Sequence, residues 1–160
     1  MCGKERSGLA HADAGLFRGA PFIFTKLSNT NGSAERLAEE MAATLGARPV
    51  WLEPESHDAL VAATSHVPYL LAAALVAATP VAGRPVVGSG FQSAARLAGS
   101  SPEMMTGIVR TNRRFILEAL DRLQGELRRL ESLIRTQADV ELAETLNRAR
   151  EVYYHLVTLE

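Results

Sequence analysis

The chain has 160 residues, of which 47% are hydrophobic and 22% are charged, the balance of an ordinary globular protein. With 17 basic and 18 acidic residues its formal net charge is -1, which gives no support to nucleic acid or an anionic membrane as the main partner. Cys2 is the only cysteine, so an intrachain disulfide and a cysteine-based metal site are excluded. These features favour a cytoplasmic protein.

The first third of the chain has the pattern of an α/β unit. The opening stretch that contains Glu5 has two glycines and no apolar periodicity, so we expect a loop there. Short runs of aromatic and β-branched residues predict strands over 21–25 and 48–53. Between them, Ser33 is placed to cap a helix that Gly46 would end. Two strands cannot form a stable sheet alone, so this unit needs strands that the chain does not obviously supply.

From Pro54 onward the pattern is helical. Pro54 suits the first turn of a helix that continues through an apolar run at 67–78, with a kink expected at Pro68. The apolar run is shorter than the roughly 20 residues of a bilayer span, so we expect a buried core helix. Three glycines and a proline predict a loop over 81–90, and Ser101, followed by a proline and an acid, predicts the next helix start.

Two stretches near the C-terminus carry heptad stripes. Apolar residues recur at alternating steps of four and three from Ile116 to Ile134, on the helix that begins after Ser101, and again from Leu142 to Leu156. The short polar turn between them predicts an antiparallel helical hairpin. Stripes of this length are long for one small domain to cover, which favours packing against a second subunit. A monomeric bundle that covers both stripes is the alternative.

Few residues point to chemistry by themselves. His66 lies beside a proline in an apolar helix, where it could be a satisfied structural group or face a ligand. His57 and Asp58 could decorate an exposed first turn. Arg96 follows a glycine-rich turn, and its guanidinium suits a carboxylate, although a surface position fits it equally. Asn112, mid-helix among apolar neighbours, needs a buried partner.

Two kinds of site are disfavoured. The four histidines are not spaced for a shared metal, and paired thiols are absent. No glycine cluster follows a strand and opens a helix with the spacing of a dinucleotide-binding loop. The chain therefore shows no nucleotide site of its own.

Taken together, these stretches resemble the C-terminal portion of the prephenate dehydrogenase family, which includes arogenate and cyclohexadienyl dehydrogenases. The similarity is carried, in order, by MCGKERSG, LFRGAPFIFT, HDALVAATSHVPYLLAAAL and GFQSAARLAGSSPEMMTGIVRTN. The first is similar to the family loop M-x-G-x-E-x-S-G and the third to a helix with S-H-L-P-H. The fourth is similar to G-F-x-D-x-T-R, followed by M-W and an asparagine. Any one motif is weak, but the ordered set is fairly specific.

The resemblance implies a mostly α-helical chain with a small α/β remnant of two short strands and a helix. Residues 1–53 would be the tail of a nucleotide-binding α/β domain. Residues 54–160 would be an all-helical domain for dimerisation and substrate binding, with a long antiparallel hairpin. The family's catalytic histidine, in an H-P pair, and the nucleotide-binding unit would lie upstream of Met1. No catalytic residue is therefore assigned, and we expect the chain alone to be inactive.

The resemblance also implies an activity. The family's reaction is the NAD(P)-dependent oxidative decarboxylation of prephenate to 4-hydroxyphenylpyruvate, in tyrosine biosynthesis. The chain would belong to an oxidoreductase that uses NAD or NADP, bound mainly by the upstream part, and no metal. Its partners would be a second copy of the chain and a small acidic substrate, prephenate or arogenate, with no nucleic acid and no membrane.

By position, the resemblance assigns six residues to the substrate site. Arg96 corresponds to the carboxylate-binding arginine, Glu5 to the loop acid near the pocket entrance, and His66 to the first helix histidine. The other three are Tyr69, Ser89 and Met105.

The chain departs from the family pattern at two of these positions. Tyr69 stands where the family has the second helix histidine, and Met105 where it has tryptophan. These changes leave the choice between prephenate and arogenate open. The alternative function is a non-catalytic helical homodimer that senses an aromatic or cyclohexadienyl acid.

Overall fold

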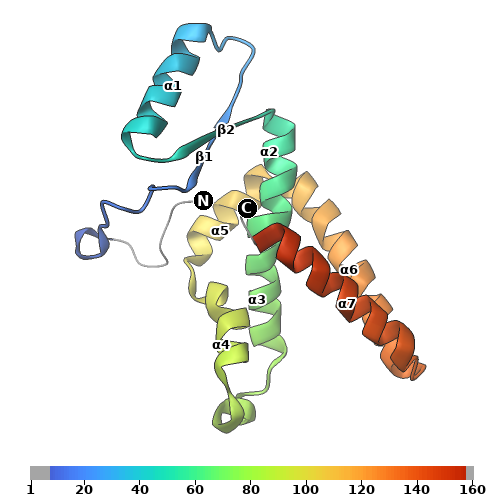
Figure 1. Cartoon of the computed structure of the whole chain (residues 1–160). Helices are drawn as coiled ribbons and strands as arrows, with labels where there is room; N and C mark the ends of the chain where they lie inside the picture. Colours follow the sequence, from blue (N-terminus) through green and yellow to red (C-terminus); the bar gives the residue numbers. More distant parts are fainter. Residues whose placement is uncertain (1–7, 158–160) are drawn as a thin grey trace. The chain divides into compact units, whose positions relative to one another are not determined.

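The structure, a computed structural model, describes residues 8–157. The chain forms two compact units, Met1–Ile116 and Leu117–Glu160. In the first unit a strand–helix–strand segment is followed by a run of helices, and the second unit is a helical hairpin (Figure 1). The prediction of a mostly α-helical chain with a small α/β segment is confirmed. The predicted boundary between residues 53 and 54 falls within the first unit and stays a prediction.

The strand–helix–strand segment follows a single 3₁₀ turn, η1 (Leu9–His11). Strands β1 (Pro21–Thr25) and β2 (Arg48–Leu52) pair in parallel, and α1 (Gly32–Thr44) connects them. Both strands and the helix lie where the sequence predicted them. The sheet has two strands in residues 8–157, and none of their residues is fully buried, so it stays an incomplete layer.

The two ends of α1 are set by short local contacts. Asn31, rather than the predicted Ser33, is the N-cap, since its Oδ1 accepts from the Ala34 N–H at 3.0 Å. Ser33 Oγ donates to the same Asn31 oxygen at 2.7 Å and so supports the cap. Gly46 ends the helix as predicted: it adopts a φ of 66° and its N–H donates to the Ala43 carbonyl.

A 25-residue helix runs unbroken through the first unit. It comprises α2 (Pro54–Val61), the π-helical turn η2 (Ala62–His66) and α3 (Val67–Ala78). The Val67 N–H donates to the carbonyl of Ala62, five residues back. This π turn lies immediately before Pro68, which has no N–H to donate. The kink that the sequence predicts at Pro68 stays a prediction.

The apolar part of this helix is less buried than the sequence predicted. Val67 and Ala72 are buried, but Leu71 and Val76 are exposed, and 28% of the most apolar window is buried in the chain. By length and composition alone the helix could cross a membrane, a test that the core helix of a soluble protein also meets. The exposed side chains leave part of α3 without a partner in the described residues.

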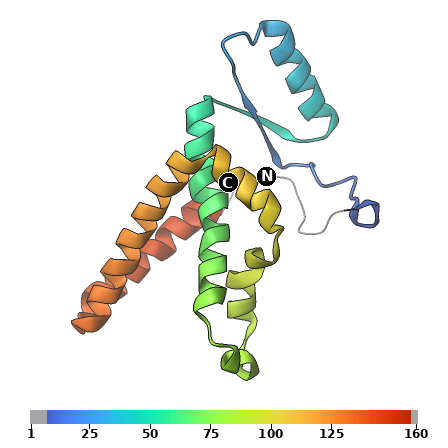
Figure 2. The ribbon, with the colours of Figure 1, turned by 180° about the vertical axis from the view of Figure 1, so that it is seen from behind.

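Three short helices follow α3, and the last two of them pack back along it. They are the 3₁₀ helix η3 (Val81–Val86), α4 (Ser89–Ala95) and the 3₁₀ turn η4 (Arg96–Gly99). Figures 1 and 2 both show α4 beside α3. The prediction of a loop over 81–90 is wrong in part, because Pro85 is accommodated inside a 3₁₀ helix and Ser89 already begins α4.

The next helix, α5 (Pro102–Thr111), begins as predicted. Ser101 is its N-cap, and its Oγ accepts from the Met104 N–H at 3.3 Å. The sequence predicted that this helix would continue to Ile134, and this is wrong: Asn112 leaves the helical conformation with φ −119° and ψ 30°. A separate helix, α6 (Arg113–Arg135), follows.

The second unit is the predicted antiparallel hairpin of α6 and α7 (Asp139–Val157). Both views show the two helices meeting at the turn that joins them (Figures 1 and 2). Gln137, in that turn, has a φ of 54°. The apolar stripes are incompletely covered, since Leu127, Ile134, Leu146 and Leu156 are all exposed. The two helices therefore do not bury each other's stripes.

Candidate functional site

A cavity of about 440 Å³ lies in the first unit. It is bounded by β1 and the segment before it, by α2 and η2, and by the end of α5. Its lining is mostly apolar, with five polar or titratable residues from the helical walls. The lining residues are Phe17, Pro21, Phe22, Ile23, His57, Asp58, Val61, His66, Ile108, Thr111 and Asn112. We call it the His66 cavity.

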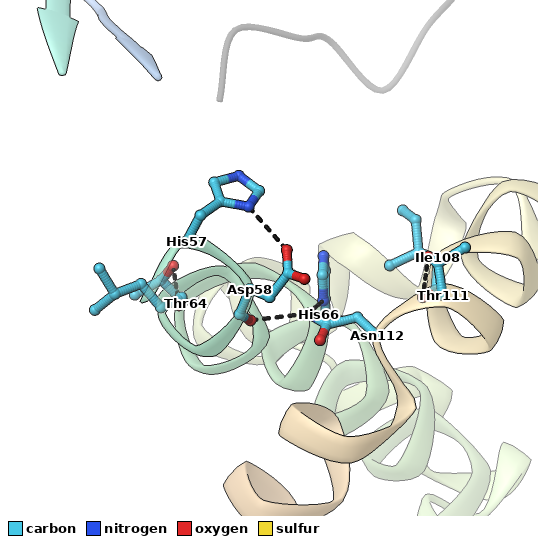
Figure 3. Close-up of polar contacts among 8 residues, drawn as sticks. His57, Asp58, Thr64, His66, Ile108, Thr111 and Asn112 are labelled. Atoms are coloured by element: carbon cyan, nitrogen blue, oxygen red, sulfur yellow. Dashed lines mark hydrogen bonds and ion pairs between the residues drawn. The ribbon is translucent and has the colours of Figure 1, made fainter. Parts of the chain in front are cut away.

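Two of the polar residues are neighbours on the first turns of α2. His57 Nδ1 donates to Asp58 Oδ1 at 2.9 Å (Figure 3). A carboxylate only accepts hydrogen bonds, so the proton of this contact belongs to Nδ1 of His57. The side chains are 32% and 46% exposed, so they lie on a partly exposed first turn, but they also line the cavity, which the sequence did not predict.

Two further polar residues come from different elements and are buried, whereas Thr111 is exposed. His66, at the end of the π turn, is 8% exposed, and Asn112, in the break between α5 and α6, is 7% exposed. Asn112 Nδ2 donates to the backbone carbonyl of Asp58 at 2.8 Å and lies 3.3 Å from His66 Nδ1. Asn112 is thus the buried polar group that the sequence predicted, and its partners come from the α2–η2 helix.

Burial lowers the pKa of His66 below its ordinary value of 6.5. The negative charge of Asp58 opposes this shift, and the nearby His57 adds to it. Figure 3 shows the Asp58 side chain between the two histidine rings. Because desolvation is the largest cause, His66 is an uncharged imidazole at neutral pH.

The predicted site residues do not gather around one cavity. His66 lines the His66 cavity, whereas Tyr69 and Met105 line a second cavity of about 290 Å³ together with Arg110 and Arg113. Arg96 and Ser89 are exposed and line neither cavity. Glu5 lies outside the described residues. The six assignments therefore stay predictions.

Several lining residues were not assigned to a site by the sequence. His57 and Asp58 differ from surface residues only by tertiary packing, which no local pattern reveals. The sequence did carry a signal for Phe17 and Phe22, since these aromatic residues lie just before and within a predicted strand whose sheet lacks partners. In residues 8–157 no group of three or more His, Cys, Asp or Glu side chains is arranged to hold a metal ion.

Comparisons with known proteins agree on one family. Residues 53–148 match the family model described as "Prephenate dehydrogenase, dimerization domain". The prephenate dehydrogenase of Bacillus subtilis is 34% identical over 155 residues, covering 92% of this chain and 40% of that protein. The chain thus spans less than half the length of this relative.

Solved structures show the same relationship. The arogenate dehydrogenase of Synechocystis superposes with a TM-score of 0.84 at 27% identity, over 97% of this chain and 59% of its own. A prephenate dehydrogenase from A. aeolicus, in complex with hydroxyphenyl propionate and NAD+, gives 0.87 at 27% identity, over 98% of this chain and 57% of its own. With a family model matched over more than half of its length, the chain belongs to the prephenate dehydrogenase dimerization-domain family.

Proposed function

We propose that the chain is the dimerisation and substrate-binding part of an enzyme that oxidatively decarboxylates prephenate or arogenate. The observation that carries this proposal is the match of residues 53–148 to the family, in a chain whose first unit contains the His66 cavity. A mostly apolar cavity of about 440 Å³ with a few convergent polar groups has the size and character of a small-molecule site.

The cavity wall suits a ring-shaped ligand. Phe22 and Ile108 offer apolar surface to a six-membered ring, and the uncharged His66 offers a hydrogen bond without a charge. Arg96 is proposed to bind a substrate carboxylate, as the resemblance implies, with Tyr69, Ser89, Met105 and Glu5 as further contacts. The described residues of this set lie on two cavities, α4 and η4, so the proposal requires that substrate binding brings them together.

The described residues do not fit a dinucleotide. The turn from β1 to α1 has no glycine-rich phosphate loop, and the parallel sheet has two strands in residues 8–157. We propose that NAD or NADP is bound mainly by a part of the enzyme beyond these 160 residues, and that the isolated chain does not catalyse the reaction. We also propose a cytoplasmic location.

A homodimer is part of the proposal. The matching family model is described as a dimerization domain, and the apolar stripes of α6 and α7 are partly exposed in the single chain. Burying these stripes against a second copy would remove apolar surface from water, at about 25 cal/mol for each Å². The proposal therefore assigns the hairpin to the interface between subunits.

Titration calorimetry on the 160-residue chain tests the binding proposal. We expect prephenate or arogenate to bind, and we expect Arg96→Ala to weaken that binding at least tenfold because it removes the carboxylate partner. Arg36→Ala, an exposed arginine on α1 outside both cavities, is the matched control and should bind like the wild type. A nicotinamide assay on the same sample should show no turnover.

The other outcomes are equally informative. Turnover by the purified chain would overturn the proposal that the nucleotide site lies elsewhere. Binding of tyrosine but neither cyclohexadienyl acid would favour the alternative, a helical homodimer that senses an aromatic acid. If no ligand binds, the substrate-binding proposal fails, and the chain is better described as an interaction module.

A further inference from the structure

We propose that Asn112 is a positioning residue that fixes the proton of His66 on Nε2, so that the ring presents an N–H donor to the His66 cavity. The proposal concerns which of two neutral tautomers the histidine adopts and which side chain decides it. It states that Nε2 of His66 is a hydrogen-bond donor in the cavity, which neither the fold nor the family match assigns.

The first step fixes the orientation of the Asn112 amide. The atom that lies 2.8 Å from the Asp58 backbone carbonyl must be a donor, because a carbonyl oxygen only accepts. That atom is therefore Nδ2, and Oδ1 is on the other side. This orientation depends on Asp58 alone and is independent of any assumption about His66.

The second step derives the tautomer of His66 from this amide orientation. The amide has two N–H groups, and with one given to Asp58 the other is available to His66 Nδ1, 3.3 Å away. An unprotonated Nδ1 accepts this hydrogen bond, whereas a protonated Nδ1 would place its own N–H opposite the amide N–H, and two donors repel each other. The neutral ring must then carry its proton on Nε2. The lowered pKa of His66 has the same direction, since charging the ring would also protonate Nδ1.

The third step places the donor. Nδ1 is occupied by Asn112, and His66 lines the cavity, so Nε2 is the ring nitrogen left for a ligand. Figure 3 shows the second ring nitrogen of His66 on the side away from Asn112. A ligand must meet it with an acceptor: a carbonyl, carboxylate or hydroxyl oxygen. The identity of that ligand rests on the proposed function, but the tautomer does not.

The neighbouring histidine shows the opposite arrangement. His57 Nδ1 faces a carboxylate oxygen at 2.9 Å and therefore carries the proton. Two histidines on one helix thus differ in tautomer because one faces an acceptor and the other faces a donor. This contrast supplies an internal reference for a measurement on the whole chain.

The test is a ¹H–¹⁵N correlation spectrum of the histidine rings of the ¹⁵N-labelled 160-residue chain, recorded across pH without ligand. The His66 signals are assigned by their loss in His66→Gln. We expect the Nε2–H pattern for His66 at neutral pH and the Nδ1–H pattern for the uncharged form of His57. An Nδ1–H pattern or a charged ring for His66 at pH 7 in the wild-type chain would overturn the proposal.

Asn112→Asp then tests the role of the amide. A carboxylate at this position would accept from Nδ1, so we expect the His66 pattern to change to Nδ1–H or to the charged form, with a higher pKa. His57→Gln, which leaves the amide in place, should keep the Nε2–H pattern. If a folded Asn112→Asp chain keeps that pattern, the amide does not decide the tautomer and the proposal fails.

Prephenate added to the wild-type chain separates this inference from the proposed function. Binding through Nε2–H should shift that proton's signal without changing the tautomer. If prephenate leaves the ring signals unchanged while the tautomer is the expected one, the proposed substrate site fails and the role of Asn112 stands.

Discussion

At the residue scale, the polar groups around the His66 cavity differ in how they are held. His57 and Asp58 are half-buried and paired with each other, so water screens much of their attraction. His66 and Asn112 are buried, and their hydrogen bonds reach between elements that are 46 residues apart in sequence. Breaking a buried hydrogen bond leaves a desolvated group without a partner, which costs more than losing an exposed one. The buried hydrogen bonds around His66 and Asn112 therefore stabilise the cavity wall more than the His57–Asp58 pair does.

His66 should make stability depend on pH. The folded chain holds the pKa of this histidine below 6.5, so between the two values the unfolded chain binds a proton that the folded chain does not. Stability is then fully present above about pH 6.5 and is lost as the pH falls toward the folded pKa, by at most about 1.4 kcal/mol for each pH unit. Urea denaturation from pH 8 to pH 5 should show this loss.

The matched variant is His66→Gln, which cannot titrate. It should flatten the acid side of the stability curve relative to wild type, whatever its effect at pH 8. His57→Gln should leave the slope that belongs to His66 in place. An acid slope that is identical in wild type and His66→Gln would show that another group carries it.

At the element scale, two residues at the N-terminus of α1, Asn31 and Ser33, are candidate caps with different contacts. Asn31 accepts directly from the helix backbone, whereas Ser33 contacts only the Asn31 side chain. We expect Asn31→Ala to cost about 1 kcal/mol of stability and Ser33→Ala clearly less. Thermal denaturation followed by circular dichroism compares the two. A larger loss for Ser33→Ala would restore serine as the cap.

These elements show how far the sequence could predict the structure. Pro54, Ser101 and Gly46 act through their own backbone geometry, so their helix ends were predictable from local chemistry. The choice of Asn31 over Ser33 depends on where the chain leaves the extended conformation, and both residues suit that role. The break at Asn112 could not be predicted, because a long-range hydrogen bond to Asp58 accompanies it.

The candidate site was less predictable than the fold. His66 was found because a histidine in an apolar helix is conspicuous. The sequence could not show that His57 and Asp58 line the same cavity as Phe22, since the contact joins β1 to a helix that starts about 30 residues later. The six substrate-site residues were assigned by the family resemblance. In the structure, those that are described line two different cavities or are exposed on α4 and η4.

At the scale of the whole molecule, apolar surface is left exposed on the hairpin. Leu146 is 54% exposed and Leu156 is 76% exposed, although both lie on a heptad stripe. None of the α7 residues that the structure describes is buried, so most of the apolar stripe on this helix is available for a partner. Contiguous exposed apolar surface of this kind marks interaction sites in proteins.

Sedimentation equilibrium tests whether a second copy covers that surface. We expect the wild-type chain to be a dimer at micromolar concentration and Leu146→Glu to shift it to monomer, because a carboxylate on the stripe would be buried without a partner in the dimer. Arg148→Glu also places a carboxylate on α7, but off the stripe, so it should remain dimeric. A monomeric wild type, or equal weakening by both substitutions, would assign the stripe to another partner than this chain.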